Sequence, residues 1–308
     1  MPYDMTSKLK IAVTTRALFS LEKENELFDT EGLEAYEKFQ IDNEEVLIEK
    51  GVAFSLVKQI LKINAIPETK DRVEVIIVTR NNGSSSLRVF NSIKQYALPI
   101  TRGFFTGGDE LVPYLKAMDV DLFLTANQKD AQKARDAQIP TAVICTDNIP
   151  NDYAIKDDLS IRIAFDGDAV LFSDDSEVVY KTEGLESFKK NESELADVPM
   201  TEGPFFKFLK VIADLQKALG EKQGFIKTAL ITARDAPSHE RVIKTLRNWG
   251  VRIDEMFFLG GIDKTPILEA FGAQIFFDDQ KSYTGPASAV VPSATVPYSS
   301  DSKLYTEE

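Results

Sequence analysis

Short apolar runs alternate along the chain with segments whose apolar residues recur at helical spacing. In the first half, these runs predict strands at residues 9–13, 73–78, 103–105, 122–124 and 141–144. The helical patterns lie between the first two strands of each half, at residues 33–39, 54–63, 186–190 and 205–219. Strands that alternate with helices indicate parallel α/β sheets, and the intervening helices can form small caps over the strand ends.

The most informative run is the apolar strand Ile161-Arg162-Ile163-Ala164-Phe165, which continues into Asp166-Gly167-Asp168. Parallel strands present reactive groups at their carboxyl ends, and the glycine permits a tight turn, so both carboxylates can face one small site. Two acids in that position suggest a metal ligand and a nucleophile. The alternative is a strand that simply ends in a polar turn, because Asp and Gly are the commonest turn formers.

Three more polar features follow predicted strands of the second half. Thr232 ends one strand and is followed by the turn Ala233-Arg234, while Lys264 comes after a strand and a pair of glycines. The acidic pair Asp278-Asp279 ends a third strand. A hydroxyl, a lysine and a second acidic pair are therefore expected at the same edge of the sheet as the first two acids.

This order of groups resembles the haloacid dehalogenase superfamily of phosphohydrolases. The whole chain is more similar still to the cytosolic 5′-nucleotidase type I family. The strings that carry this closer match are 16–19 (RALF), 106–108 (TGG), 164–174 (AFDGDAVLFSD), 232–234 (TAR) and 276–280 (FFDDQ). Because these strings are spread over both halves, the resemblance covers nearly the full length of the chain.

The resemblance implies that Asp166 is a nucleophile that forms an aspartyl-phosphate. Asp168 would protonate the leaving oxygen and then activate water. It also implies a Mg²⁺ cofactor held by Asp166, Asp168, Asp278 and Asp279, with Asp168 contributing its backbone carbonyl, and the sequence does not show which of the last two binds directly. Countercharge is required, because one carboxylate facing a phosphate dianion at ~4 Å and an effective dielectric of ~20 costs on the order of 8 kcal/mol.

The phosphate itself needs further partners in this scheme. Lys264 supplies a second positive charge, and the Thr232 hydroxyl can donate a hydrogen bond to a phosphate oxygen. Ala233 and Arg234, which complete the turn after Thr232, are assigned to substrate binding by the same resemblance.

The sequence also contains an internal repeat of nearly constant offset. Thr14 and Asp166 are 152 positions apart and Thr125 and Asp278 are 153 apart, so one inserted residue explains the difference. Two α/β units share strands and glycine turns in any case, but a constant register over this length favours a true repeat. The predicted fold is therefore α/β, with two tandem Rossmann-like (haloacid dehalogenase-like) parallel-sheet units that carry small helical caps. Their boundaries are 1–150 for a catalytically silent copy, 151–298 for a catalytic copy, and 299–308 for a polar, mobile tail.

The first copy lacks the groups that chemistry requires. Thr14 stands where the second copy has Asp166, Leu111 stands for Lys264, and Thr125 stands for Asp278. Its remaining polar residues at strand ends include Arg16, Arg80 and Asn82. These residues either hold the sugar or base of a substrate or only cap helices and tie turns together.

Composition narrows the class of partner and the compartment. The chain has 49 Asp and Glu against 36 Lys and Arg, a net charge of −13, which opposes binding to nucleic acid polymers and acidic membranes. Its single cysteine fits a reducing compartment, and no run of apolar residues approaches membrane-spanning length. We therefore expect a cytoplasmic protein. The single histidine, His239, excludes a histidine-rich metal site.

These observations predict a Mg²⁺-dependent phosphoric monoester hydrolase that converts nucleoside 5′-monophosphates to nucleoside and phosphate. The reaction class follows from the groups of the second copy, and the nucleotide specificity follows from the resemblance alone. A phosphatase for another small phosphomonoester, such as a sugar phosphate, is one alternative. A nucleotide-binding regulator without turnover is another. The sequence leaves open the base, the sugar, any effector and whether the chain forms a homo-oligomer.

Overall fold

The computed structural model describes residues 3–146 and 160–306. The strands are β1 (Leu9–Val13), β2 (Val73–Thr79), β3 (Arg102–Phe105), β4 (Leu122–Thr125), β5 (Thr141–Ile144), β6 (Ile161–Phe165), β7 (Ile226–Thr232), β8 (Glu255–Phe258), β9 (Ile275–Asp278) and β10 (Ser293–Thr295). The α-helices are α1 (Thr15–Leu18), α2 (Glu22–Asp42), α3 (Phe54–Lys62), α4 (Leu87–Gln95), α5 (Val112–Ala117), α6 (Gln128–Asp136), α7 (Asp175–Glu183), α8 (Leu185–Glu194), α9 (Phe206–Leu219), α10 (His239–Trp249), α11 (Thr265–Phe271) and α12 (Lys281–Ala287). Shorter helical turns are η1 (Ile63–Ala65), η2 (Pro67–Thr69), η3 (Gly167–Leu171) and η4 (Gly220–Phe225).

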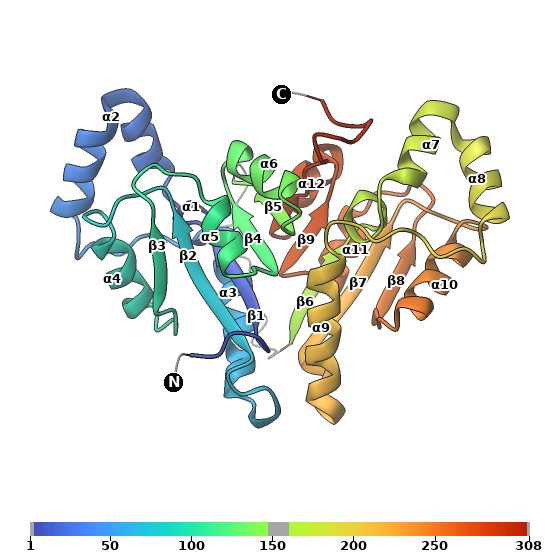
Figure 1. Cartoon of the computed structure of the whole chain (residues 1–308), viewed down its shortest axis with the longest axis horizontal. Coiled ribbons are helices and arrows are strands. Elements are labelled where there is room, and N and C mark those ends of the chain that lie inside the picture. Colours follow the sequence, from blue (N-terminus) through green and yellow to red (C-terminus); the bar gives the residue numbers. More distant parts are fainter. Residues whose placement is uncertain (1–2, 147–159, 307–308) are drawn as a thin grey trace.

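The strands form one sheet in the order β3-β2-β1-β4-β5-β10-β9-β6-β7-β8. Neighbouring strands are parallel within each half, and the two halves meet where β5 and β10 pair in antiparallel orientation. Read outward from that junction, the order of the first five strands matches the order of the last five. Figure 1 shows the result, with the two halves side by side and the chain's C-terminal segment above the junction. The sequence predicts two separate sheet units, whereas the structure has one continuous mixed sheet of 10 strands.

Successive residues of a strand point to opposite faces of the sheet and so belong to different hydrophobic clusters. Ile11 of β1 and Ile163 of β6 belong to one cluster that continues across both halves and includes the buried faces of α3 and α9. On the other face of the sheet, Ala12 belongs to a cluster confined to the first half and Ala164 to one confined to the second half. Because the strands are covered on both faces, their sequences are almost continuously apolar.

The same local contacts recur in both halves beyond the strands. The backbone N–H of Thr14 donates to Leu124 O at 3.0 Å, as that of Asp166 donates to Phe277 O at 2.8 Å. Gly51 and Gly203 each lie so close to backbone that an added Cβ would clash, with Phe19 in one half and Phe172 in the other. Glycine is therefore required at both places.

Each half carries a pair of helices interrupted by a glycine in the left-handed region. In α2 the break is at Gly32 (φ 84°), and Gly184 (φ 85°) separates α7 from α8. Other residues adopt this conformation only at a cost. Figure 1 shows α2 at one end of the molecule and the α7–α8 pair at the other.

The structure corrects two further expectations. The acidic run at residues 174–177 has the composition of a charged loop, but α7 begins at Asp175, and Ser176 and Glu177 are buried. The described part of the polar tail is held by hydrogen bonds rather than free. Ser300 Oγ donates to Asp136 of the first half at 2.6 Å, and Ser302 Oγ donates to Asp174 of the second half.

Candidate functional site

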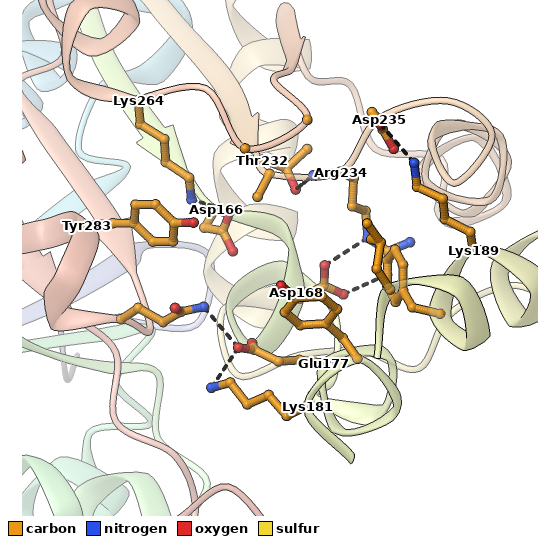
Figure 2. A pocket seen from close by; sticks show the side chains of 17 residues that line it. Asp166, Asp168, Glu177, Lys181, Lys189, Thr232, Arg234, Asp235, Lys264 and Tyr283 are labelled. Atoms are coloured by element: carbon orange, nitrogen blue, oxygen red, sulfur yellow. Dashed lines mark hydrogen bonds and ion pairs between the residues drawn. The ribbon is translucent and has the colours of Figure 1, made fainter. Parts of the chain in front are cut away.

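The carboxyl ends of β6, β7 and β9 bring the predicted acids and lysine of the second half together. Asp166 directly follows β6, and its Oδ1 accepts a hydrogen bond from Lys264 Nζ at 2.7 Å. The same ammonium group lies 2.6 Å from Oδ2 of Asp278, the last residue of β9. Figure 2 shows Lys264 reaching down to Asp166 beside the ring of Tyr283, which lies 4.2 Å from Nζ. Asp166 and Asp278 lie 98 and 14 positions from Lys264 in the sequence, and both contact its buried ammonium group.

A cluster of three buried carboxylates can accept a metal ion. Asp166, Asp278 and Asp279 each offer one oxygen, and these oxygens lie within 4.8 Å of one another. Asp279 Oδ1 is buried and has no hydrogen-bond partner, whereas its Oδ2 accepts a hydrogen bond from the Tyr298 hydroxyl. An orphaned buried carboxylate oxygen is costly unless another group satisfies it. The donor set is all oxygen, which fits a hard divalent cation.

The electrostatics of the cluster show a shortage of positive charge. Burial raises the pKa of Asp166 to about 7, the Asp278 and Asp168 charges add to the effect, and Lys264 opposes it. Burial also raises the pKa of Asp279 well above its ordinary value, and the charge of Glu177 adds to the shift. Burial opposes the charge of Lys264, but the Asp166 and Asp278 carboxylates beside it raise its pKa. One buried lysine therefore does not neutralise three acids.

Asp168 points away from this cluster and toward Arg234. The two side chains form a bidentate pair, with Nε–Oδ2 at 2.8 Å and Nη2–Oδ1 at 2.7 Å. Such fork-like pairs are both strong and directional. The Asp168 carboxylate therefore lies outside the cluster of three acids, while the contact of its backbone carbonyl with a metal stays a prediction. The side chain of Arg234, expected at the substrate, is held by an acid.

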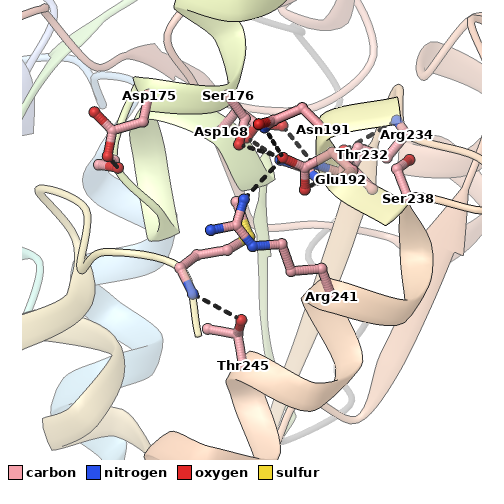
Figure 3. A network of polar contacts seen from close by, with 12 residues as sticks. Asp168, Asp175, Ser176, Asn191, Glu192, Thr232, Arg234, Ser238, Arg241 and Thr245 are labelled. Atoms are coloured by element: carbon pink, nitrogen blue, oxygen red, sulfur yellow. Dashed lines mark hydrogen bonds and ion pairs between the residues drawn. The ribbon is translucent and has the colours of Figure 1, made fainter. Parts of the chain in front are cut away.

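Arg234 belongs to a buried polar network that the sequence did not reveal. Its Nη1 lies 2.5 Å from Glu192, which also binds Arg241 at 2.9 Å and accepts a hydrogen bond from Ser176 at 2.9 Å. Glu192 has no exposed surface, and the charges of Arg234 and Arg241 overcome the effect of burial and lower its pKa. Figure 3 shows these groups converging on Glu192. The network ties α7, α8 and α10 to the turn after β6 and the turn after β7.

Thr232 and Ala233 line a cavity that Asp166 of the acidic cluster also lines. Thr232 ends β7, is buried, and accepts a hydrogen bond from the backbone N–H of Arg234 at 3.2 Å. The cavity has a volume of about 340 Å³, and Asp166, Asp168 and Lys264 also line it. Its outer wall comes from the helical pair, through Tyr180, Lys181, Leu185, Phe188 and Lys189.

The polar residues singled out in the first half do not reach this cavity. Arg16 pairs with Glu22 at 2.5 Å, Arg80 pairs with Asp130 at 2.6 Å, and Asn82 Oδ1 accepts from the backbone N–H of Ser85 at 3.0 Å. All three line a separate cavity at the carboxyl ends of the first-half strands. The structure therefore brings Asp166, Thr232, Lys264, Asp278 and Asp279 together but places Arg16, Arg80 and Asn82 elsewhere.

Sequence reasoning missed three residues of the site. Glu192 had only a weak signal, because it lies four positions after Phe188 and so shares the buried face of α8. Glu177 was hidden in an acidic run, yet it lines the cavity and accepts a hydrogen bond from Gln280 at 2.9 Å. Tyr298 carries no signal at all, because only the folding back of the C-terminal segment brings it to Asp279.

The Glu192 network makes a testable contribution to stability. We expect Glu192→Gln to lower the free energy of unfolding by about 3–5 kcal/mol, because it leaves two buried arginines short of an anion. Denaturant unfolding followed by circular dichroism measures this. The pKa of Glu192 is lowered in the native state, so its contribution is present above the ordinary value of 4.5 and is lost as the pH falls through the native pKa.

Glu194→Gln on the same helix is the matched control. Glu194 and Lys190 form an exposed pair at 3.9 Å, and such pairs contribute about 0–1 kcal/mol. If Glu192→Gln is no more destabilising than Glu194→Gln, the network does not hold the helical pair in place.

Fold and site together define an α/β protein with a buried acid-and-lysine centre at the sheet edge under a helical pair. The sequence pattern of the family described as 5′-nucleotidase matches residues 1–303. The chain is 37% identical over 281 residues to cytosolic 5′-nucleotidase 1B of Homo sapiens, an alignment that covers 88% of this chain. The chain spans about half the length of that curated relative, 46% of it. No solved structure matches the chain.

The chain belongs to the 5′-nucleotidase family. In the part of the chain that the structure describes, no helix has both the length and the apolar character needed to cross a membrane.

Proposed function

We propose that this protein is a Mg²⁺-dependent 5′-nucleotidase that hydrolyses nucleoside 5′-monophosphates to nucleoside and phosphate. The observation that carries the proposal is the buried Asp166 carboxylate, held 2.7 Å from Lys264 at the base of a cavity. Family membership supports the substrate class, because the human relative is named as a cytosolic 5′-nucleotidase. That name also supports a cytoplasmic location for this chain.

In the proposed first step, an Asp166 carboxylate oxygen bonds to phosphorus while the bond from phosphorus to the 5′ oxygen breaks. The leaving oxygen takes a proton from Asp168, which releases the nucleoside. Lys264 and the Thr232 hydroxyl hold phosphate oxygens and disperse their charge. Because Asp168 is paired with Arg234, the proton transfer requires its carboxyl group to turn from the guanidinium toward the leaving oxygen.

In the second step, water attacks the phosphorus of the aspartyl-phosphate and gives its proton to Asp168. The bond between phosphorus and the Asp166 oxygen breaks, so inorganic phosphate leaves and both carboxyl groups return to their starting state. The Glu192 network fixes Arg234, so it determines where Asp168 rests between the two transfers.

The metal site in this proposal consists of Asp166, Asp278 and Asp279, and the orphaned Asp279 Oδ1 is the observation that supports it. When bound, Mg²⁺ supplies positive charge that reduces the repulsion between the nucleophile and the phosphate. Asp168 would contribute through its backbone rather than through its carboxylate, because Arg234 occupies the latter.

The repeat supports the structural part of the proposal. We take residues 1–150 as a silent copy and 151–298 as the catalytic copy, both Rossmann-like and haloacid dehalogenase-like. Their strand orders match outward from the junction. Gly32 in one half and Gly184 in the other occupy equivalent breaks between helices. The residues of 151–298 that fall before 160 lie outside the described residues.

A panel of phosphomonoesters tests the substrate class. Nucleoside 5′-monophosphates are expected to be hydrolysed with a higher kcat/KM than sugar phosphates, because the helical pair offers Tyr180 and Phe188 to an aromatic base. A higher kcat/KM for sugar phosphates would mean that the protein is a sugar phosphatase and not a nucleotidase. Binding of nucleotides without release of phosphate, and without turnover of a generic aryl phosphate, would mean a regulator and not an enzyme.

Tyr298 should set the affinity for the metal. Its hydroxyl donates to Asp279 Oδ2 and so orients the carboxylate whose other oxygen is orphaned. We expect Tyr298→Phe to weaken Mg²⁺ binding by about 10-fold, within the range seen when partners of metal ligands are removed. Isothermal titration of the protein with Mg²⁺ gives the affinity directly.

Tyr305→Phe, further along the same segment, is the control for a general effect of losing a tyrosine hydroxyl there. It should leave the Mg²⁺ affinity unchanged. An equal loss in the two variants would mean that the segment acts through its packing and that the hydrogen bond to Asp279 is unimportant.

A further inference from the structure

The first half has a cavity of its own, and nothing in the proposed reaction uses it. It measures about 480 Å³, against about 340 Å³ for the candidate catalytic cavity. It opens at the carboxyl ends of β1, β2 and β4, and α2 forms its outer wall through Phe28, Leu33 and Tyr36. It therefore occupies the place in the first half that the catalytic cavity occupies in the second.

The lining of this cavity excludes the chemistry of the other one. Thr14 takes the place of Asp166, with the equivalent backbone hydrogen bond, and Thr125 ends β4 as Asp278 ends β9. Leu111 caps α5 where Lys264 caps α11. Among residues 3–146 and 160–306, the cluster of acids suited to a metal lies only in the second half. A ligand could bind in the first-half cavity but would not be hydrolysed there.

The two arginines that line the cavity are already paired with carboxylates of the protein, and Glu37 adds a negative charge to the lining. Arg16 pairs with Glu22 at 2.5 Å, and Arg80 pairs with Asp130 at 2.6 Å and Glu110 at 3.3 Å. A phosphate placed here would have to compete with these carboxylates for the guanidinium groups. Burying an anion without a countercharge is costly, so the cavity favours an uncharged ligand.

Two observations indicate what such a ligand carries. The Phe28 and Leu33 side chains are 44% and 58% exposed, and Phe28 packs edge-to-face on Tyr36 at 6.0 Å, so the wall offers apolar and aromatic surface. Thr14 is only 7% exposed, and its Oγ1 is buried without a hydrogen-bond partner. A buried hydroxyl without a partner is costly, and a ligand in the cavity could supply the partner.

We propose that the first-half cavity binds a neutral molecule that combines an aromatic ring with hydrogen-bonding groups, of the class of nucleosides. The ring packs on Phe28 and Tyr36, and a polar group of the ligand satisfies Thr14. Binding does not depend on hydrolysis, but the choice of a nucleoside rests on the proposed function, because a nucleoside is the product that the second half would release.

Equilibrium binding of adenosine tests the proposal. Isothermal titration of the full chain should show two sites, one in each half. Phe28→Ala should weaken one of them by about 10-fold, the size of effect expected when an aromatic platform under a base is removed. Thr14→Val, which keeps the shape but removes the hydroxyl, should weaken the same site severalfold. Both variants should leave phosphate release from AMP unchanged.

Tyr180→Ala is the matched variant, since Tyr180 lies 152 positions after Phe28 and lines the catalytic cavity. It should weaken the other adenosine site only. One adenosine site that only Tyr180→Ala disturbs would overturn the proposal, as would a first-half site that prefers AMP to adenosine. AMP hydrolysis without adenosine binding to the first half would support the proposed function and overturn the ligand site in the first-half cavity. If adenosine binding depends on Phe28 but the chain has no phosphatase activity, the ligand site in the first-half cavity is supported and the proposed function is wrong.

Discussion

Asp166→Asn is expected to reduce turnover of a nucleoside monophosphate by about 10³-fold or more, a loss of at least ~4 kcal/mol of transition-state stabilisation. The amide has nearly the same volume as the carboxylate but is a poor nucleophile. Folding should be nearly intact, because burial already disfavours the charge of Asp166, raising its pKa to about 7, and Lys264 keeps Asp278 as a partner. Steady-state kinetics and a thermal melt measure the two effects separately.

A covalent step leaves a second signature. Acid quenching during turnover of a labelled substrate should trap phosphate on the wild-type protein but not on Asp166→Asn. Asp168→Asn should slow both steps, because Asp168 transfers a proton in each, but it keeps the nucleophile and should still trap residual phosphate. Asp42→Asn on exposed α2 is the control for losing one negative charge. An Asp166→Asn protein that kept more than about a tenth of the wild-type rate, a difference of only ~1.4 kcal/mol, would show that Asp166 is not the nucleophile.

Removal of divalent cations should abolish activity, and Mg²⁺ should restore it. Of the three buried carboxylates, Lys264 pairs with only Asp166 and Asp278, so without a cation the phosphate would meet uncompensated negative charge. Mg²⁺ should also stabilise the fold itself, by about 2.7 kcal/mol when its concentration is 100 times the dissociation constant. A thermal melt with and without Mg²⁺ reads this gain independently of activity.

Asp279→Asn separates site binding from general screening of the net charge of −13. The variant should lose most of the stabilisation by Mg²⁺, whereas NaCl of the same ionic strength should not replace Mg²⁺ in either protein. Full activity after exhaustive chelation would exclude the metal from the mechanism.

Groups at strand ends were predictable from the sequence because their positions follow from local pattern. An apolar run fixes a parallel strand, and the residue after it must lie at the shared edge of the sheet, so Asp166, Thr232 and Asp278 were expected to meet there. Lys264 was found in the same way, from its place at the start of a helix that follows a strand.

Other parts depend on contacts that no local pattern contains. Strand β10 is only Ser293–Thr295, too short for a hydrophobic signal, yet it joins the two halves into one sheet. Arg234 was expected at the substrate from the resemblance, and in the structure Asp168 and Glu192 hold its guanidinium group. Its position depends on Glu192 of α8, which lies 42 residues earlier in the chain, and sequence spacing does not show that α8 returns to this turn.

Because one core is shared across one face of the sheet, substitutions on the two faces should have unequal consequences. A large-to-small substitution at Ile11 removes packing from the cluster that also contains Ile163 and Phe165 of the second half. The same kind of change at Ile76, on the opposite face, affects only the cluster of the first half. The face of the sheet to which a first-half side chain points therefore decides whether its loss disturbs the first half alone or also the packing beneath the candidate site of the second half.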